Sequence, residues 1–389
     1  MSNNSSITNC DVLVLGGGMS GLALACHIAD YNDLYSDQEK DTWVIEPRVK
    51  YLSDKTWCFW QQDANLFDSA VTHRWNRWLI KSGDNTHICR SSELDYVMVD
   101  SGRYYAIAQE RLARSTSVNL LTGTRAEALQ IGQTQITVDC DDVQFKADYV
   151  YDTRPKEIPF GTLLQHFVGW EIETDQDVFD THTVTLMDFQ ASNDDDIHFF
   201  YVLPFTKRHA LVETTHFSKK SLEDKIYLEE LTHYITTELG IGEWRILREE
   251  RGIIPMPKKP PNPEQRAHYN VIPFGLYADT AKPSTGYCYP HAQHQAKQHA
   301  SRLFAGTAHQ VTAVRKPVAQ WLDHVFISFL EHQPAHAAST FIRLFKRVPE
   351  PVLIRFLSDN ANFTDYLKVI AAMPKFLFIC EAFRCAKNL

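Results

Sequence analysis

The chain has 389 residues, more than the roughly 100–200 of one ordinary domain, which predicts two domains or one large interleaved unit. Hydrophobic residues make up 44% of the chain and charged residues 22%, a balance that excludes a wholly disordered protein. The formal net charge of −9 argues against nucleic acid as a partner, because proteins that bind phosphate backbones carry a basic surface.

The eight cysteines include no C-x-x-C pair, so the sequence contains neither a thioredoxin-like motif nor a zinc ribbon. His291, His294 and His299 have spacings of three and five without a carboxylate partner, and we predict no metal site. The first ten residues lack the features of a signal peptide, and no apolar stretch approaches the roughly 18 residues of a membrane-spanning helix. We therefore expect reduced thiols and a cytoplasmic protein, either soluble or peripheral to a membrane.

The N-terminal part predicts a strand–helix–strand unit. Residues 11–15 form a short apolar run closed by glycines, which predicts a buried strand. Residues 21–29 are small and apolar and predict the helix that follows. Residues 42–45 predict a second strand, which ends at Glu46. Together these elements form one βαβ unit.

The turn of this unit, Gly16-Gly17-Gly18-Met19-Ser20-Gly21, matches the G-x-G-x-x-G pattern. Gly16 permits the tight turn, Gly18 lets the backbone approach a pyrophosphate, and Gly21 lets the helix pack on the strand. The helix N-terminus attracts phosphates, and Glu46, 25 positions after Gly21, can bind ribose hydroxyls. We predict dinucleotide binding. FAD is favoured because the turn is N-terminal and a long mixed region follows it, with an NAD enzyme as the alternative.

The remaining predicted elements are a helix, several strands and a helical C-terminal part. In chain order they are a helix over 103–113, strands over 135–140 and 147–151, antiparallel strands over 198–204 and 209–215, a Pro-rich loop over 257–263, and mostly helix from 291 onward.

The C-terminal stretch 341–389 is basic and aromatic. It holds eight basic and four acidic residues, a local charge of +4 in an acidic chain. Phe341, Leu344, Phe345 and Val348 follow helical spacing. Such a tail suits an anionic bilayer surface. The alternative is a helical cap whose aromatic side chains lie in the core.

Beyond the glycine-rich turn, a series of short segments carries a family resemblance. The segments span residues 54–60, 165–171, 179–180, 186–189, 200–204, 211–215, 252–256 and 283–287. In this order and spacing they resemble the bacterial lycopene β-cyclases, flavoproteins that close the rings of carotenoids. The resemblance runs nearly end to end.

The resemblance implies a fold and a cofactor. The fold is an α/β structure in which a Rossmann-type FAD-binding domain is interleaved with an antiparallel-sheet substrate domain, followed by a helical C-terminal region. We place the FAD-binding domain at 1–60, 95–160 and 245–300, the substrate domain at 61–94 and 161–244, and the helical, membrane-facing region at 301–389. FAD acts in its reduced form, NAD(P)H is the electron source, and the reaction has no net redox change.

The resemblance also assigns site residues. Glu213 matches the acid/base candidate of the family, and Pro283 and Gly286 belong to a segment of the flavin site. The chain departs from the family at Tyr277-Ala278-Asp279, where relatives carry Ala-Gly-Gly. Asp279 also resembles the aspartate of flavin monooxygenases, so it joins the cofactor-binding candidates, although its spacing to Pro283 is short for that motif.

Cyclisation of lycopene predicts an acid in a dry aromatic tunnel. Burial in an apolar strand would keep Glu213 protonated, as a general acid needs; an outward-pointing Glu213 would be only an edge charge. Asp188 is the second catalytic candidate, with a structural carboxylate as the alternative, and Asp180 is a weaker one. The candidates for lining the substrate are Trp170, Glu171, Phe200 and Tyr201, although aromatic residues more often pack in a core.

Two other functions remain open at this level. One is a flavin monooxygenase or isoprenoid reductase that consumes NAD(P)H, which Asp279 favours. The other is a non-catalytic protein that binds a carotenoid.

Overall fold

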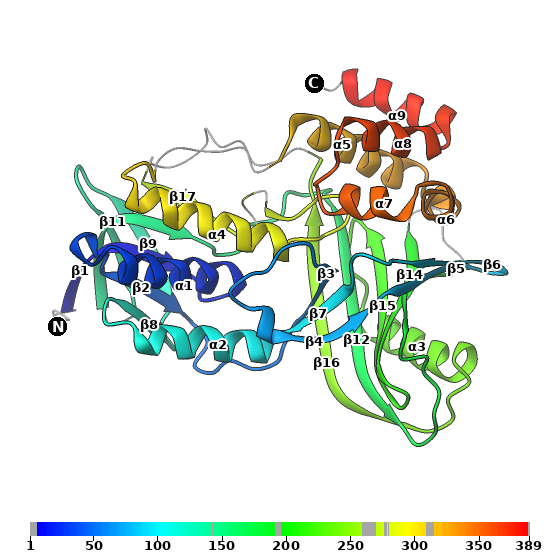
Figure 1. Cartoon of the computed structure of the whole chain (residues 1–389), viewed down its shortest axis with the longest axis horizontal. Helices are drawn as coiled ribbons and strands as arrows, with labels where there is room; N and C mark the ends of the chain where they lie inside the picture. The colour runs from blue at the N-terminus through cyan, green and yellow to red at the C-terminus, as the bar shows by residue number, and fades with distance from the viewer. Residues whose placement is uncertain are drawn as a thin grey trace.

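The computed structural model describes residues 6–141, 143–190, 196–258, 270–275, 278, 280–308 and 315–387. In this part of the chain the strands form two seven-stranded sheets and one three-stranded sheet. The first sheet and its helices lie at one end of the molecule, and the second sheet lies at the other end beneath the C-terminal helices (Figure 1).

The first sheet has the order β8-β2-β1-β11-β10-β9, and β17 also pairs with β11. Its strands are β1 Ser6–Leu15, β2 Thr42–Glu46, β8 Val118–Thr122, β9 Ala126–Ile131, β10 Ile136–Cys140, β11 Val143–Asp152 and β17 Val271–Pro273. Pairings of β1 with β2 and β11 are parallel, and β9 and β10 are antiparallel. Successive residues from Val12 to Leu15 are fully buried because both faces of a parallel sheet are covered. The predicted strands of this region are confirmed.

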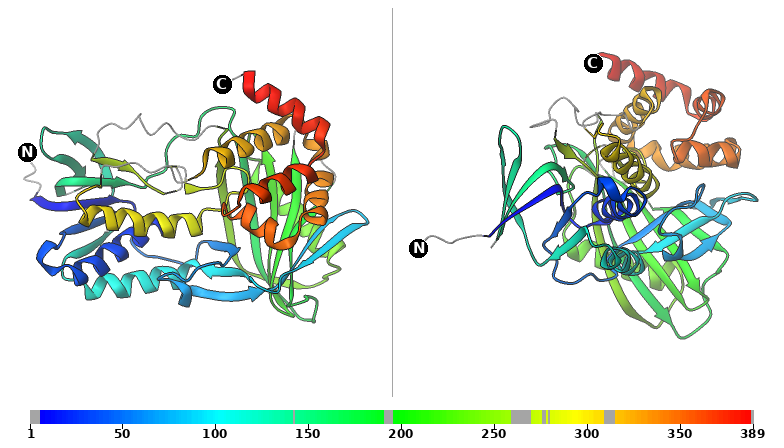
Figure 2. Two further views of the ribbon diagram at one scale, coloured as in Figure 1. Left: turned by 45° about the horizontal axis from the view of Figure 1, so that its top comes forward. Right: turned by 60° about the vertical axis from the view of Figure 1, so that its left-hand side comes forward.

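Three helices cover one face of this sheet. They are α1 Met19–Leu34, α2 Ser101–Arg114 and α4 Tyr289–Phe304. The two views in Figure 2 show α1 between α2 and α4. Helix α1 is therefore buried around most of its circumference, which explains why residues 21–29 are small and apolar throughout.

The second sheet has the order β16-β12-β15-β14-β13-β5-β6. Its strands are β5 Arg77–Ser82, β6 Asn85–Arg90, β12 Leu163–Thr174, β13 Thr183–Phe189, β14 Ile197–Thr206, β15 His209–Ser218 and β16 Trp244–Met256. The predicted antiparallel pair is confirmed as β14 and β15. One face of this sheet packs on α3 Asp224–His233. The opposite face points toward the part of the molecule that contains the glycine-rich turn.

One predicted boundary is wrong at β16. Residues 245–256 were assigned to the FAD-binding domain, but β16 pairs along its length with β12 of the second sheet. The pairing is antiparallel and runs from Leu163 to Thr174 on β12. A strand belongs to the sheet that satisfies its backbone hydrogen bonds, so these residues extend the substrate side.

A three-stranded sheet joins the two larger parts. It consists of β3 Thr56–Trp60, β4 Val71–Trp75 and β7 Tyr96–Asp100 in the order β3-β7-β4. Residues Trp60 and Tyr96 of this sheet lie in the same core cluster as residues of the second sheet.

The C-terminal part is mostly helical, as the sequence predicted, and its described residues 315–387 contain five α-helices. They are α5 Pro317–His332, α6 Ala337–Arg347, α7 Glu350–Leu357, α8 Phe363–Ala372 and α9 Lys375–Lys387. Phe341, Leu344 and Phe345 of α6 pack into the core cluster of the second sheet. Among the described residues, no helix combines the length and apolar character needed to cross a bilayer. The predicted loop over 257–263 lies outside the described residues except for 257 and 258.

Candidate active site

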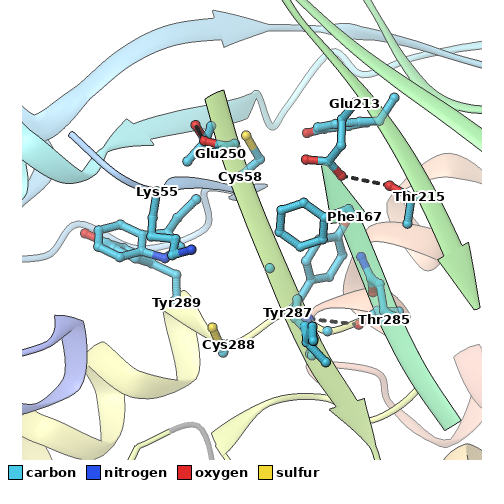
Figure 3. A pocket seen from close by; sticks show the side chains of 18 of the residues that line it. Lys55, Cys58, Phe167, Glu213, Thr215, Glu250, Thr285, Tyr287, Cys288 and Tyr289 are labelled. Carbon is cyan, nitrogen blue, oxygen red and sulfur yellow. Dashed lines mark hydrogen bonds between the residues drawn. The ribbon is translucent and has the colours of Figure 1, made fainter. Parts of the chain in front are cut away.

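One cavity of about 570 Å³ connects the glycine-rich turn to the second sheet. Its lining includes Gly18 and Ser20 of the glycine-rich turn and also Phe341 and Leu357 of the C-terminal helices. Figure 3 shows side chains of β3, β15 and β16 and of the segment before α4 pointing into this space.

The three glycines of the turn have different neighbours. Gly16 has φ +104°, and a Cβ there would lie 2.3 Å from Thr153 Oγ1. A Cβ at Gly21 would lie 2.0 Å from the carbonyl oxygen of Gly16, so α1 could not pack so closely on β1. At Gly18, by contrast, no described atom lies within 4 Å of the Cβ position. The open side of Gly18 faces the cavity.

The N-terminus of α1 also faces this cavity. Gly18 is its N-cap residue, and among the described residues no side chain caps the helix. Gly18, Met19 and Ser20 all line the cavity. The first N–H groups and the positive end of the helix dipole are therefore available to an anion, which fits the pyrophosphate of a dinucleotide.

Glu46 holds the turn itself. Its Oε2 accepts a hydrogen bond of 2.7 Å from the Gly17 N–H, and its Oε1 accepts one of 2.8 Å from Arg48 Nε. Burial raises the pKa of Glu46, but the hydrogen bonds from Arg48 and Gly17 outweigh burial and leave it below its usual value. Arg48, which the sequence analysis did not single out, lines the cavity with its guanidinium 4.7 Å from the Tyr51 ring centroid.

The segment before α4 forms another wall. Ser284, Thr285 and Gly286 line the cavity, and Pro283 is buried in the same turn. Gly286 has φ +73°, and a Cβ there would lie 2.9 Å from Gln165 Oε1. The turn is closed by a 2.8 Å hydrogen bond from the Gly286 N–H to the Lys282 carbonyl. Asp279, the remaining cofactor candidate, lies outside the described residues.

Glu213 points into the cavity from β15. Its side chain is 8% exposed, and its Oε1 accepts a hydrogen bond of 2.8 Å from Thr215 Oγ1. Burial, supported by the negative charge of Glu250, raises the pKa of Glu213 to about 8, although Thr215 and Lys55 act in the opposite direction. At neutral pH this carboxyl group therefore carries its proton and can donate it.

Asp188 lies away from the cavity. Its Oδ2 accepts hydrogen bonds from Tyr234 Oη at 2.9 Å and from Lys81 Nζ at 3.1 Å. Tyr234 belongs to the cluster that covers the opposite face of the sheet. The structure thus gives Asp188 the structural role that stood as its alternative. Asp180 lies on the segment between β12 and β13, and its Oδ2 is 3.3 Å from Arg77 Nη2.

The four substrate-lining candidates divide between the two faces of the sheet. Tyr201 lines the cavity. Trp170 and Phe200 face α3 instead, where Phe200 stacks on Tyr234 with ring centroids 3.8 Å apart. Adjacent strand residues point to opposite faces, and here Tyr201 points to the cavity while Phe200 points to the α3 side. Glu171 is not among the lining residues. Its Oε1 lies 2.7 Å from His209 Nε2, and its Oε2 pairs with Arg248 Nε at 2.8 Å.

Several cavity residues escaped the sequence analysis. Lys55, Cys58 and Tyr287 lie in segments that carry the family resemblance, but the sequence of these segments did not indicate that the three side chains face the site. Phe167 of β12 lines the cavity directly, and Glu250 lines it from β16, which pairs with β12. Alternation along β12 could have found Phe167 once the orientation of one neighbour was known.

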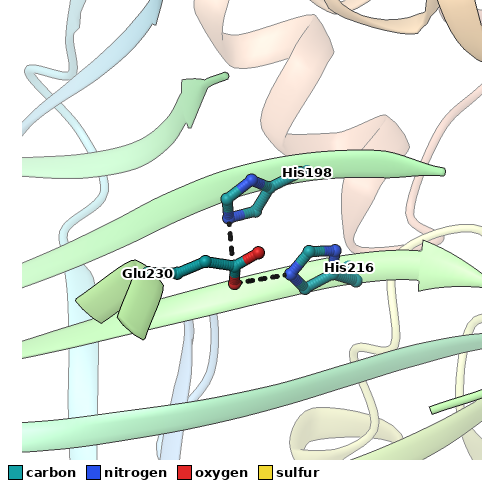
Figure 4. A group of neighbouring side chains, drawn as sticks. All are labelled: His198, His216 and Glu230. Carbon is teal, nitrogen blue, oxygen red and sulfur yellow. Dashed lines mark hydrogen bonds and ion pairs between the residues drawn. The ribbon is translucent and has the colours of Figure 1, made fainter. Parts of the chain in front are cut away.

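A second polar cluster lies on the opposite face of the sheet. His198 of β14, His216 of β15 and Glu230 of α3 bring their ligand atoms within 4.8 Å of one another (Figure 4). His216 lies 2.6 Å from Asp196 Oδ2 and 2.9 Å from Glu230 Oε2. Burial lowers the pKa of His216, but the two carboxylates outweigh it and raise the pKa to about 9. Both ring nitrogens are therefore engaged in an ion-pair network that joins α3 to the sheet.

Comparison of the sequence with known proteins gives a family. A family model described as lycopene cyclase protein matches residues 11–380. A lycopene beta-cyclase from Paracoccus sp. (strain N81106 / MBIC 01143) is 27% identical over 239 residues, which cover 57% of this chain and 59% of that enzyme. A lycopene beta-cyclase from Pantoea ananas is 24% identical over 388 residues, 94% of each chain. The match therefore spans less than two thirds of the Paracoccus relative and nearly all of the Pantoea relative.

Solved structures resemble the whole fold. A geranylgeranyl bacteriochlorophyll reductase-like protein from Thermoplasma acidophilum has a TM-score of 0.60 at 13% identity and covers 96% of this chain and 98% of its own. The flavin-dependent monooxygenase PieE, solved in complex with FAD and substrate, has a TM-score of 0.59 at 12% identity, with coverage of 94% and 71%. These likenesses confirm the predicted fold class, that of Rossmann-type flavoproteins.

Proposed function

The chain belongs to the lycopene cyclase protein family, and we propose that it closes rings at the ends of an acyclic carotenoid such as lycopene, with Glu213 as the proton donor. The observation that carries this proposal is the buried carboxyl group of Glu213, whose pKa is raised by burial to about 8, in the same cavity as the glycine-rich turn. Acid chemistry on an apolar substrate needs both a proton held at neutral pH and a space that excludes water.

FAD is the cofactor that these residues fit. The uncapped N-terminus of α1 and the open side of Gly18 would hold the pyrophosphate, and the turn at Ser284–Gly286 would hold the flavin part. Reduced FAD would supply negative charge beside a cationic substrate. NAD(P)H is the proposed reductant that keeps the cofactor in this state.

The chain's own residues would carry the proton chemistry. Glu213 donates a proton to the terminal double bond of the carotenoid, and the resulting cation is captured by a neighbouring double bond, which closes the ring. The aromatic side chains of Phe167, Tyr201 and Tyr287 line the cavity and would stabilise the cation, each face contributing roughly 2 kcal/mol when desolvated. Loss of a proton then gives the neutral ring product, so the reaction is an isomerisation.

The C-terminal helices support a peripheral contact with a membrane, where such a substrate dissolves. Phe376 and Phe383 of α9 are 78% and 68% exposed, and Phe363 and Ile370 of α8 are also exposed. Eight basic residues against four acidic ones lie in 341–389. Exposed aromatic residues beside an excess of basic ones favour an anionic lipid surface.

Anaerobic incubation with lycopene, chemically reduced flavin and heavy water tests the reaction class. We expect cyclic product with one deuterium per ring formed and no oxidation of the flavin. In a second, aerobic assay with NAD(P)H as the reductant, consumption of NAD(P)H in proportion to product would instead identify a monooxygenase or reductase. Pigment that binds and is recovered unchanged would identify a carotenoid-binding protein.

A further inference from the structure

A glycine separates two buried carboxyl groups on three neighbouring strands of the second sheet. Gly169 of β12 lies opposite Glu213 of β15 on one side and opposite Glu250 of β16 on the other. Directly opposed residues on neighbouring strands point to the same face of a sheet. Glu213 and Glu250 accordingly both line the cavity, with exposures of only 8% and 4% (Figure 3).

Gly169 contributes no side chain between these two acids. A Cβ at this position would lie 3.1 Å from Leu211 Cδ1 and 3.4 Å from Glu213 Cβ. The space above β12 is thus just sufficient for a residue without a side chain. The two carboxyl groups share a wall of the cavity at a separation of two strand spacings, about 10 Å between their Cα atoms.

The two carboxyl groups have different hydrogen-bond partners. Glu250 Oε2 accepts hydrogen bonds of 2.6 Å from Arg248 Nη1 and 2.7 Å from Thr56 Oγ1, so this carboxyl group is ion-paired with a cation. The hydroxyl group of Thr215, a neutral donor, is the hydrogen-bond partner of Glu213. One carboxyl group is thus ion-paired and the other is buried beside a neutral partner, and such a difference in environment is typical of an acid and a base that act in one reaction.

Other polar groups surround the two carboxyl groups, but none of those described below is a free base. Lys55 stands beside Glu213 and Arg248 beside Glu250, and both are cations. Cys58 of β3 and Tyr201 of β14 also line the cavity, but burial raises the pKa of each and keeps them neutral. Asp54 also lines the cavity, with its Oδ2 3.7 Å from Arg48 Nη1. Among the described carboxylates of the lining, Glu250 is the one that faces Glu213 across Gly169.

We propose that Glu250 is the base that removes the final proton in the ring closure, a role that rests on the proposed function. The O–H bond of Glu213 breaks as a C–H bond forms on the terminal alkene. The electron pair of the neighbouring double bond forms the ring C–C bond. A C–H bond beside the new cation then breaks, its electrons restore a double bond, and its proton goes to Glu250. After the product leaves, Glu250 gives its proton to the solvent and Glu213 takes one from the solvent, so the enzyme is restored with no net proton or electron consumed.

The kinetic test compares Glu250→Gln with its neighbour Glu249→Gln, using lycopene and chemically reduced flavin. Glu249 lies on the other face of β16 and bonds Trp170 and Arg251, so its variant should turn over as the unmodified protein does. We expect Glu250→Gln to lower kcat about 100-fold with little change in KM, because a lost general base costs at least that much. Removing the negative charge of Glu250 should also move the alkaline limb of the pH profile to lower pH.

Infrared titration of the flavin-loaded protein without substrate supplies a readout independent of turnover. The carbonyl band of a protonated carboxyl group should titrate near pH 8, vanish in Glu213→Gln, and titrate at lower pH in Glu250→Gln. If Glu250→Gln loses flavin, Glu250→Asp is used in its place. This variant keeps a carboxyl group, so the infrared carbonyl band and the alkaline limb of the pH profile should stay near their original pH while turnover becomes slower.

The outcomes separate the two proposals. An unmodified protein that leaves lycopene unchanged overturns the proposed function and this role with it. An active protein in which Glu250→Gln keeps its kcat, pH limb and infrared midpoint overturns the role of Glu250 alone.

Discussion

At the scale of single residues, burial and one neighbouring charge determine the chemistry of Glu213. The side chain sits on an apolar strand, and the sequence already favoured a raised pKa there. The structure adds the charge of Glu250, which lies on a strand 37 positions further along the chain. Only the pairing of both strands with β12 brings the two together.

Glu213→Gln should keep flavin and lose ring closure by at least about 100-fold, because the amide has no proton of suitable acidity.

The same change should stabilise the fold at neutral pH. A pKa raised from 4.5 to about 8 means that the unfolded chain ionises first, so stability falls as the pH rises from 4.5 to 8. Removing the acid should therefore recover up to about 3 kcal/mol at pH 7. Urea unfolding at pH 4 and pH 7 measures this; an equal effect at both values would contradict it.

At the scale of elements, the turn between β1 and α1 separates folding from binding. The Cβ position of Gly21 meets the Gly16 carbonyl, whereas that of Gly18 meets no described atom. Identical substitutions at the two positions should therefore have different consequences.

Gly18→Val should fold normally but be purified without the yellow colour of flavin, because the valine side chain would occupy the pyrophosphate site. Gly21→Val is the matched comparison and should lower the melting temperature or prevent folding, since helix α1 must move away from β1. Absorption spectra and thermal unfolding of the two variants check this. A yellow Gly18→Val would remove the turn from the cofactor site.

The contact of α3 with the second sheet depends on the charge of His216. Its pKa of about 9 exceeds the ordinary 6.5, so its stabilising effect is complete below pH 6.5 and is lost as the pH rises through 9. His216→Gln should cost up to about 3 kcal/mol near pH 6 and much less above pH 9. Urea unfolding across this range measures the difference, with the exposed His233→Gln of α3 as the control. A cost independent of pH would show that His216 acts by packing alone.

At the scale of the whole molecule, the first sheet and the C-terminal helices lie at different ends (Figure 1). Residues of the glycine-rich turn and of the C-terminal helices line the same cavity. A carotenoid is far longer than its ring-forming end group. A substrate that enters from a membrane at the C-terminal helices would thus bring its end group toward Glu213 and the flavin site. The proposed membrane contact would account for a basic, aromatic tail on an otherwise acidic chain.

The paired change Phe376→Ser and Phe383→Ser should weaken binding to vesicles that contain anionic lipid, because two exposed aromatic side chains of α9 are lost. Added salt should weaken binding of the unmodified protein as well. Ile131→Ser on β9, exposed at the cofactor end, is the control and should bind normally. Co-sedimentation with vesicles provides the measurement; unchanged binding of the paired variant would remove α9 from the contact.

The sequence by itself determined the βαβ unit, the family and the candidacy of Glu213, because a glycine-rich turn, a series of ordered segments and an acid in an apolar strand are local patterns. Only the tertiary structure decided which strand face lines the cavity. Alternation places Phe200 and Tyr201 on opposite faces, but it does not say which face α3 covers, so Tyr201 lines the cavity while Phe200, Trp170 and Asp188 do not. Glu250 became visible only through register, since residues opposed across a strand are neighbours in space and not in sequence.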